Sequence, residues 1–190
     1  QCEGHCVLGK KGRPVRIGKL ESFIAQFDSD MQLTHERIPE KTRGKVAIIG
    51  SGPAGLTVAG DLARQGFHVT IFEGQPEAGG VLMYGIPEYR LPKAVVRNEI
   101  KKIEDLGVHF VRNCLVGTLE SGVTVDSLFA EGFDAIFMGT GTALPQNLSI
   151  PGSDLRRVTQ STDFLHNVNA YVEGALPMEM VPLRNGDKVA

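Results

Sequence analysis

Four short apolar runs are spaced along the middle of the chain, at residues 45–49, 68–72, 108–112 and 134–138. Each is about five residues long and rich in β-branched or aromatic residues, and the first is closed directly by Gly50. Runs of this length and composition predict buried strands. We therefore expect the central part of the protein to contain a sheet whose strands are covered on both faces.

Helical patterns lie between these runs, in segments 54–65, 93–106 and 125–130. The first two are followed by glycine, Gly66 and Gly107, as helices commonly are at their C-terminal ends. The second segment has an apolar face made of Val96, Ile100, Ile103 and Leu106. Strands that alternate with helices imply parallel βαβ units with right-handed crossovers. The predicted fold class is α/β, with a Rossmann-like, doubly wound parallel sheet.

The flanks of this region follow other patterns. Residues 20–27 have one apolar helical face, formed by Leu20, Phe23, Ile24 and Phe27. Residues 38–41 then predict an extended linker, and a single helix is expected near residues 162–173. The sequence thus divides into three zones, residues 1–43, 44–150 and 151–190.

Composition narrows the class of protein. The chain has 190 residues, with 20 Lys and Arg against 22 Asp and Glu, and 42% of its residues are hydrophobic. Near-neutral charge argues against a nucleic-acid partner, and the apolar content argues against disorder. No apolar run reaches the roughly 18 residues of a membrane span. Three cysteines, an odd number, favour a reducing compartment, so we expect a cytoplasmic protein.

The strongest local motif is a glycine loop that follows the first predicted strand and opens the first predicted helix. It places Gly50, Gly52 and Gly55 in a G-x-G-x-x-G spacing. Such loops turn tightly, approach a pyrophosphate closely and pack a helix on a strand. Glu73 ends the second strand, where a carboxylate accepts hydrogen bonds from an unmodified adenosine ribose. The alternative is a structural turn with a solvated glutamate.

Two further glycine pairs indicate which dinucleotide is bound. Gly79 and Gly80 follow Glu73 closely, and the last predicted strand runs into Gly139, Thr140 and Gly141. Small residues at the carboxyl edge of a doubly wound sheet allow a ligand to lie against the backbone. Together with the glycine loop, this arrangement points to FAD rather than NAD. Each pair taken alone is more often part of an ordinary loop or turn.

The cysteines form no zinc-type pattern. Cys2 and Cys6 are spaced C-x3-C, no second pair accompanies them, and Cys114 is expected to be a buried thiol. Two thiolates belong to an iron–sulfur site only if further ligands precede residue 1. The basic run at residues 10–19 predicts a solvated face, or a docking site for an acidic electron-transfer partner.

Two long segments resemble the glutamate synthase small (beta) subunit family. They are residues 2–21, CEGHCVLGKKGRPVRIGKLE, and residues 80–93, GVLMYGIPEYRLPK. The chain is also similar to the large subunit of NADH-dependent ferredoxin:NADP oxidoreductases and to the amino-terminal half of dihydropyrimidine dehydrogenase. The resemblance implies an FAD-binding domain, first segment, at residues 44–150, preceded by the helical end of an iron–sulfur domain. Residues 151–190 would then lead into an NADPH-binding domain.

The resemblance also implies a set of FAD contacts. The pyrophosphate loop would comprise Gly52, Pro53, Ala54, Gly55 and Leu56, and Glu73 would bind the ribose. The flavin side would be lined by Gly79, Gly80 and Val81, with Arg90 reaching the phosphate or the flavin. Val116 would contact adenine, while Thr140 and Gly141 would close the pocket.

For the iron–sulfur domain, the resemblance implies 4Fe-4S ligands at Cys2, Cys6 and Glu21, with Glu21 alternatively an exposed helix residue. The chain begins with Gln1 and lacks the upstream cysteines, so we expect a piece of a longer protein with incomplete clusters. Residues 185–190 echo residues 43–47, so we expect a second dinucleotide unit to begin at Lys188; the alternative is an ordinary edge strand.

In the intact protein, the resemblance implies hydride transfer from NADPH to FAD and single-electron transfer to the clusters. The electrons would serve the large (alpha) glutamate synthase subunit or another electron-accepting subunit. Flavin chemistry needs no nucleophile–base pair, and the sequence shows no such motif. No catalytic side chain is therefore predicted. The alternatives are a ferredoxin:NADP oxidoreductase and a non-catalytic scaffold fragment.

Overall fold

The computed structural model describes residues 2–31, 33, 37–117, 122–142, 146, 149–155, 158–181, 183 and 187. The chain forms two compact units, residues 1–37 and residues 38–190. The predicted start of a second dinucleotide unit at Lys188 lies outside the described residues.

The first unit is helical. It contains two short 3-10 helices, η1 (Cys2–His5) and η2 (Val7–Lys10), followed by α1 (Ile17–Met31). The predicted helix at residues 20–27 is confirmed and is longer than its apolar pattern suggests. Its apolar face is exposed, with Phe23 and Phe27 stacked at a ring-centroid distance of 6.1 Å. No residue of α1 is buried.

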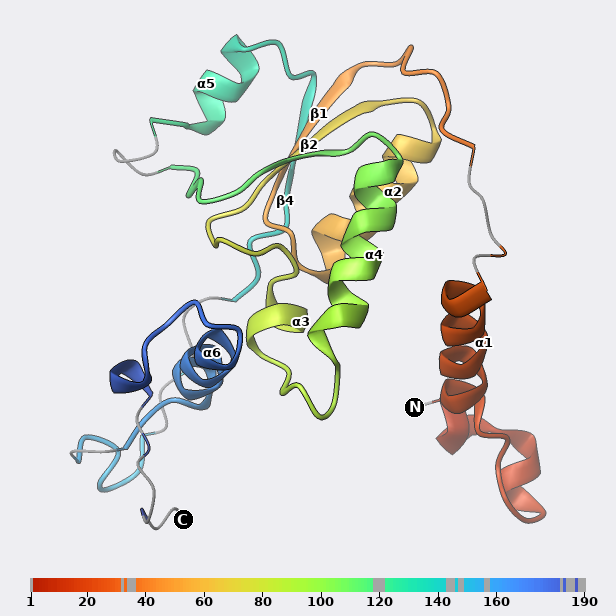
Figure 1. Cartoon of the computed structure of the whole chain (residues 1–190), viewed down its shortest axis with the longest axis vertical. Helices are drawn as coiled ribbons and strands as arrows, with labels where there is room; N and C mark the ends of the chain where they lie inside the picture. Colours follow the sequence, from red (N-terminus) through yellow and green to blue (C-terminus); the bar gives the residue numbers. More distant parts are fainter. Residues whose placement is uncertain are drawn as a thin grey trace. The chain divides into compact units, whose positions relative to one another are not determined.

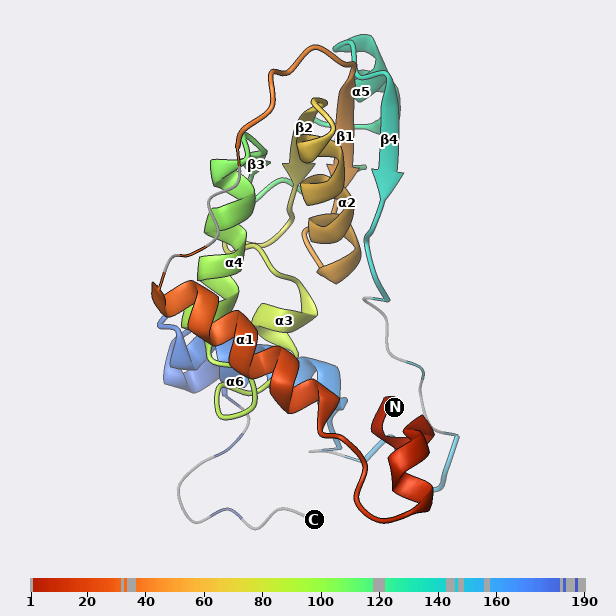
Figure 2. The same cartoon turned by 90° about the vertical axis from the view of Figure 1, so that its right-hand side faces the viewer.

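The second unit is built on a four-stranded parallel sheet (Figures 1 and 2). Its strands are β1 (Lys45–Ile49), β2 (His68–Phe72), β3 (His109–Val111) and β4 (Ala135–Met138). The order across the sheet is β3-β2-β1-β4, and every neighbouring pair is parallel. All four predicted strands are confirmed, the first two with the predicted limits. This is the order of the first four strands of a Rossmann sheet.

Helices cover both faces of this sheet. The chain continues through α2 (Pro53–Arg64), α3 (Val81–Tyr84), α4 (Lys93–Asp105), α5 (Val125–Ala130), α6 (Ser161–Val172) and η3 (Met178–Met180). Figure 1 shows α2 and α4 on one face and α5 on the other. The predicted doubly wound α/β fold is therefore confirmed.

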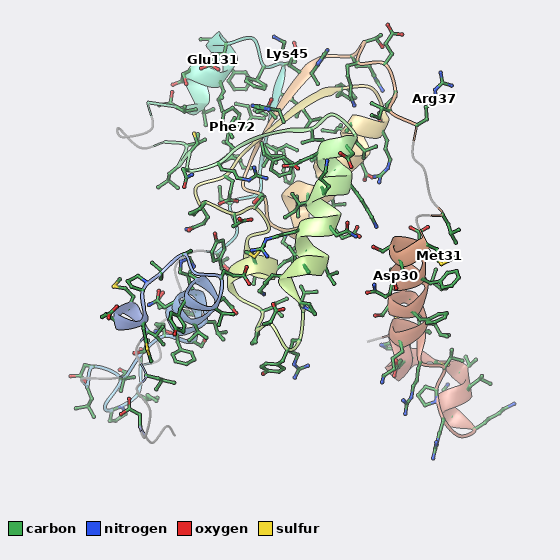
Figure 3. All side chains as sticks on the ribbon, in the orientation of Figure 1. Asp30, Met31, Arg37, Lys45, Phe72 and Glu131 are labelled. Carbon is green, nitrogen blue, oxygen red and sulfur yellow. The ribbon has the colours of Figure 1, made fainter. Side chains whose placement is uncertain are left out.

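Alternate residues of β1 pack into two separate hydrophobic cores, one on each face of the sheet. Val46 and Ile48 pack with apolar residues of α2 and α4, whereas Ala47 and Ile49 pack with Leu128 of α5. Because β1 is covered on both sides, its sequence has no polar alternation. Figure 3 shows the side chains of these layers, including Phe72, which belongs to the α5 core.

The short helix α3 does not follow from the sequence pattern, since four residues are too few to show a period. It is held by α6, which packs against it in both views (Figures 1 and 2). The rings of Tyr84 and His166 stack with centroids 4.8 Å apart, and the Asn169 amide donates to the Tyr84 carbonyl at 2.7 Å. Residues of the third sequence zone therefore pack on the wall formed by residues 80–93.

Two glycines of α2 allow a matched test of how closely α2 packs on the end of β1. A Cβ at Gly55 would overlap the carbonyl oxygen of Gly50, which is backbone, whereas one at Gly60 would meet only the end of the Arg64 side chain. We expect Gly55→Ala to lower the free energy of unfolding by about 2 kcal/mol or more. Gly60→Ala should be neutral or stabilising by about 0.5–1 kcal/mol, because alanine favours helix. Urea denaturation measures both, and equal effects would contradict the assigned contact.

Candidate dinucleotide-binding site

The glycine loop lies where the chain direction across the sheet reverses. From β1 the sheet extends to β2 and β3 on one side and to β4 on the other. Ligands of doubly wound sheets bind in the crevice at this switch point, outside the carboxyl ends of the strands. Residues 50–52 connect the end of β1 to the start of α2, so the loop occupies this position.

The three glycine positions of the motif differ in what a side chain would meet there. Gly50 has φ +98°, which side chains rarely adopt, and an added Cβ would overlap Gly139 after β4. Gly55 permits contact between α2 and the Gly50 carbonyl. Around Gly52, however, an added Cβ would meet no atom within 4 Å. Packing within the described part of the chain therefore does not require glycine at this position, whereas a ligand lying against the loop would.

The N-terminus of α2 presents backbone donors beside this open space. Gly52 is the N-cap residue and Pro53 the first helical residue, and no side chain caps the helix. The first helical N–H bond of the turn runs from Leu56 to the Gly52 carbonyl at 2.9 Å. The N–H groups of Ala54 and Gly55 precede it, at positions that have no acceptor within a helix. A helix start of this kind favours an anion.

Glu73 is buried beside the loop rather than exposed to solvent, with 7% of its surface accessible. Its Oε2 accepts hydrogen bonds from the Ser51 backbone N–H at 3.0 Å and from the Ser51 hydroxyl. Its Oε1 accepts a bond from the Gln75 N–H at 2.8 Å. The alternative of a solvated glutamate is therefore wrong. The carboxylate is held against the glycine loop by the chain itself.

Ser51 is a site residue that the sequence reasoning missed. Its side chain is fully buried, and its Oγ accepts a hydrogen bond from the Gly79 N–H at 2.9 Å while donating to Glu73. A hydroxyl between the first two glycines of the motif was the available signal. The partners of that hydroxyl lie 22 and 28 residues away, so no local pattern could identify them.

The turn that contains Gly79 and Gly80 lies directly on the glycine loop. Both have positive φ, and a Cβ at Gly80 would come within 2.9 Å of the Gly52 Cα. Gly80 is also the N-cap residue of α3, which starts at Val81, a half-exposed side chain. The structure thus brings residues 50–56, Glu73 and 79–81 together, as the sequence predicted.

Lys93 fixes the wall that follows this turn. The side chain is buried, and its ammonium donates to the carbonyl oxygens of Leu82, at 2.9 Å, and Ile86. Burial lowers the pKa of Lys93, although the nearby carboxylates of Glu88 and Glu173 oppose that shift. The ammonium therefore ties the start of α4 to α3 and to the residue two positions after it.

The other predicted contacts lie around the carboxyl edge of the sheet or beyond α3. Thr140 and Gly141 are exposed after β4, where the Gly139 N–H donates to the Ile49 carbonyl at 2.8 Å. Val116 is half-buried against the α5 core. Arg90 lies in the turn between α3 and α4 with an exposed side chain. Their roles toward a ligand stay predictions.

The predicted iron–sulfur ligands lie in the first unit. Cys2 is in η1, Cys6 follows η1, and Glu21 is an exposed residue of α1. The Val15 N–H lies 3.5 Å from the Cys6 sulfur and, with other backbone N–H groups, lowers the pKa of Cys6, which favours the thiolate form that binds metals. Among the described residues, no three His, Cys, Asp or Glu side chains are grouped closely enough to hold a metal ion. These ligands alone do not fit a cluster.

Within the described part of the chain, no helix is both long and apolar enough to cross a membrane.

A parallel sheet with the order of the first four Rossmann strands, a glycine loop at its switch point and a buried carboxylate beside that loop define the class of dinucleotide-binding proteins. The sequence model of one family, the pyridine nucleotide-disulphide oxidoreductases, matches residues 44–184. The chain belongs to this family.

Known relatives confirm the resemblance seen in the sequence. The chain is 40% identical over 165 residues to the glutamate synthase [NADPH] small chain of Bacillus subtilis, covering 86% of this chain and 33% of that protein. It is 38% identical over 144 residues to the NAD-dependent dihydropyrimidine dehydrogenase subunit PreT of Salmonella typhimurium, covering 76% of this chain and 35% of that one. The chain thus spans about a third of the length of these relatives.

A solved structure supports the fold independently. FprA from Mycobacterium tuberculosis in complex with NADPH superimposes with a TM-score of 0.58 and 27% identity, over 70% of this chain and 30% of that chain. The Rossmann-like assignment therefore agrees with a measured structure of a nucleotide-binding protein.

The buried ammonium of Lys93 leads to a stability prediction. Lys93→Met should lower the free energy of unfolding by about 2 kcal/mol, because two carbonyl groups lose their donor. Lys102→Met is the matched control on the same helix, since Lys102 is exposed and forms a surface ion pair with Glu99; it should change stability by less than about 0.5 kcal/mol. Equal losses in thermal unfolding would show that the Lys93 bonds contribute nothing specific.

The open space at Gly52 leads to a binding prediction. Gly52→Ala should lower the free energy of unfolding by no more than about 1 kcal/mol, since alanine is a poorer N-cap than glycine. It should weaken binding of ADP, which carries an adenosine and a diphosphate, by about tenfold or more, since the methyl group would occupy the ligand's space. Gly18→Ala in α1 is the control, because its added Cβ also meets no atom within 4 Å. Isothermal titration calorimetry measures the affinities. Wild-type affinity in Gly52→Ala would exclude a diphosphate at this loop.

Proposed function

We propose that the chain binds FAD and forms the first part of an FAD-binding domain in an electron-transferring oxidoreductase of the glutamate synthase small-subunit type. The observation that carries this proposal is the open space at Gly52, which is the N-cap residue of α2 and directly follows Ser51, the residue bonded to the buried Glu73 carboxylate. In the proposed organisation, residues 1–43 end an iron–sulfur domain, 44–150 begin the FAD domain and 151–190 lead to a nicotinamide-binding domain.

The residues present fit the adenosine diphosphate half of FAD. The N–H groups of Ala54 and Gly55 would hold the pyrophosphate, with Gly52 allowing the approach and Pro53 starting the helix without a side-chain cap. Glu73 would accept a bond from the ribose. The remaining proposed contacts are Gly50, Leu56, Gly79, Gly80, Val81, Arg90, Val116, Thr140 and Gly141. Bound FAD would supply the chemistry, accepting a hydride and releasing single electrons.

The protein's own contribution would be placement of the cofactor. A buried carboxylate with fixed donors holds its orientation without reorganisation when a ligand arrives. Ser51 anchors the turn at Gly79 and Gly80, and Lys93 anchors the α3 segment that follows it. These contacts would hold the flavin side of the site at a fixed position relative to the pyrophosphate loop. These residues bind and orient, and none is required to transfer a proton.

The names of the relatives support a reduced nicotinamide nucleotide as electron source and a further subunit as electron acceptor. The Bacillus subtilis relative is named for NADPH, and the Salmonella typhimurium relative for NAD. We propose the glutamate synthase large subunit as the acceptor. A dihydropyrimidine dehydrogenase partner is the second candidate, because the second relative is nearly as similar. Cys2, Cys6 and Glu21 would contribute to a 4Fe-4S cluster only together with ligands from elsewhere.

Flavin absorbance tests this proposal directly. The chain incubated with FAD and desalted should retain about one flavin per chain, with an altered 450 nm band, whereas a scaffold fragment would retain none. Glu73→Gln should weaken FAD binding by about 1–3 kcal/mol, because a buried ribose hydroxyl loses a charged acceptor. Glu99→Gln, on the exposed face of α4, is the control. An unchanged dissociation constant in Glu73→Gln would remove Glu73 from the site.

A further inference from the structure

The donors around Glu73 leave a defined part of its carboxylate available. A carboxylate has two oxygens with about four acceptor positions in total. Oε2 accepts two bonds, both from Ser51, and Oε1 accepts one, from the Gln75 N–H. Among the described residues these are its three donors. One acceptor position therefore remains, and it lies on Oε1.

A ribose presents two neighbouring hydroxyl groups, the 2′ and the 3′. With Oε2 filled by Ser51, a sugar at this site finds one acceptor position for its two hydroxyls. One hydroxyl gains a charge-assisted bond, and the other must do without the carboxylate. Losing the bonded hydroxyl should therefore cost much more affinity than losing its neighbour.

The Ser51 hydroxyl is well placed to enforce this difference. It is buried completely, it donates to Oε2, and one of its two lone pairs accepts a bond from the Gly79 N–H. Both ends of the hydroxyl are thus fixed, by the end of β2 on one side and by the Gly79 turn on the other. Rotation of the hydroxyl away from Glu73 would leave a buried donor or acceptor without a partner, which is costly.

We infer that Ser51 is a specificity-determining residue: by filling Oε2 of Glu73, it makes the site recognise one ribose hydroxyl of an adenine nucleotide rather than both. The inference rests on the proposed function, since it assumes that an adenosine ribose lies at Glu73. It goes further by assigning a role to Ser51 and by stating which oxygen contacts the sugar.

The test compares ADP with 2′-deoxy-ADP and 3′-deoxy-ADP by calorimetry on the full chain. In the wild type, one deoxy analogue should bind about tenfold more weakly than ADP and the other within about twofold. In Ser51→Ala, Oε2 regains an acceptor position, so the two analogues should bind within about threefold of each other. Thr57→Val, which removes an exposed hydroxyl bonded only to the Pro53 carbonyl of its own helix, should keep the wild-type difference.

A purely structural role of Ser51 predicts another result. If Ser51→Ala lowers the affinity for all three nucleotides by one common factor, the inference is wrong. It is equally wrong if the wild type loses the same affinity with either analogue. Ser51→Cys has a slightly larger side chain with a weaker donor and should also reduce the difference, which preserves the test if the alanine variant does not fold. Ser51→Thr keeps the hydroxyl and should restore the difference.

The inference and the proposed function fail in different ways. Absence of ADP binding to the folded wild type would overturn the proposed function, and with it any selection by Ser51. Tight ADP binding with an unchanged preference in Ser51→Ala and Ser51→Cys would overturn the role of Ser51 alone.

Discussion

A buried carboxylate imposes the central constraint on this protein. Removing Glu73 from water is costly unless donors replace the lost solvent, and three donors from two segments do so. Two come from Ser51 at the end of β1, and the third comes from Gln75 just beyond β2. The hydroxyl of Ser51 then engages the Gly79 turn, so one charge holds three segments together at the switch point of the sheet.

The same edge of the sheet depends on close backbone packing. Gly50 and Gly139 meet where β1 and β4 end, Gly55 lies on Gly50, and Gly80 lies on Gly52. Side chains at three of these contacts would push the strands, α2 and the α3 turn apart. At Gly52, by contrast, an added Cβ would meet no atom within 4 Å, and this difference separates a glycine needed by the fold from one suited to a ligand.

Beyond this edge, a second set of contacts supports the α3 wall. The Lys93 ammonium donates to the carbonyls of Leu82, within α3, and of Ile86, just after it. From α6, the His166 ring stacks on Tyr84 and the Asn169 amide donates to the Tyr84 carbonyl. Arg97 of α4 forms an ion pair with Glu173 at the end of α6. Residues 151–190, the zone expected to lead into another domain, thus help to hold the segment around α3, which would face the flavin. A displacement of α6 would therefore shift that segment.

The sequence by itself determined the four strands, the main helices and the glycine loop, because these depend on local periodicity and on local turn chemistry. It also predicted Glu73 and Gly79–Val81 as neighbours of the loop. Only the tertiary structure decided that Ser51 joins Glu73 to Gly79, that Lys93 is buried among carbonyls and that α6 covers α3. The physical reason is that hydrogen-bond partners of buried polar groups lie far along the chain, and no repeat in the sequence records which distant segments the sheet brings together.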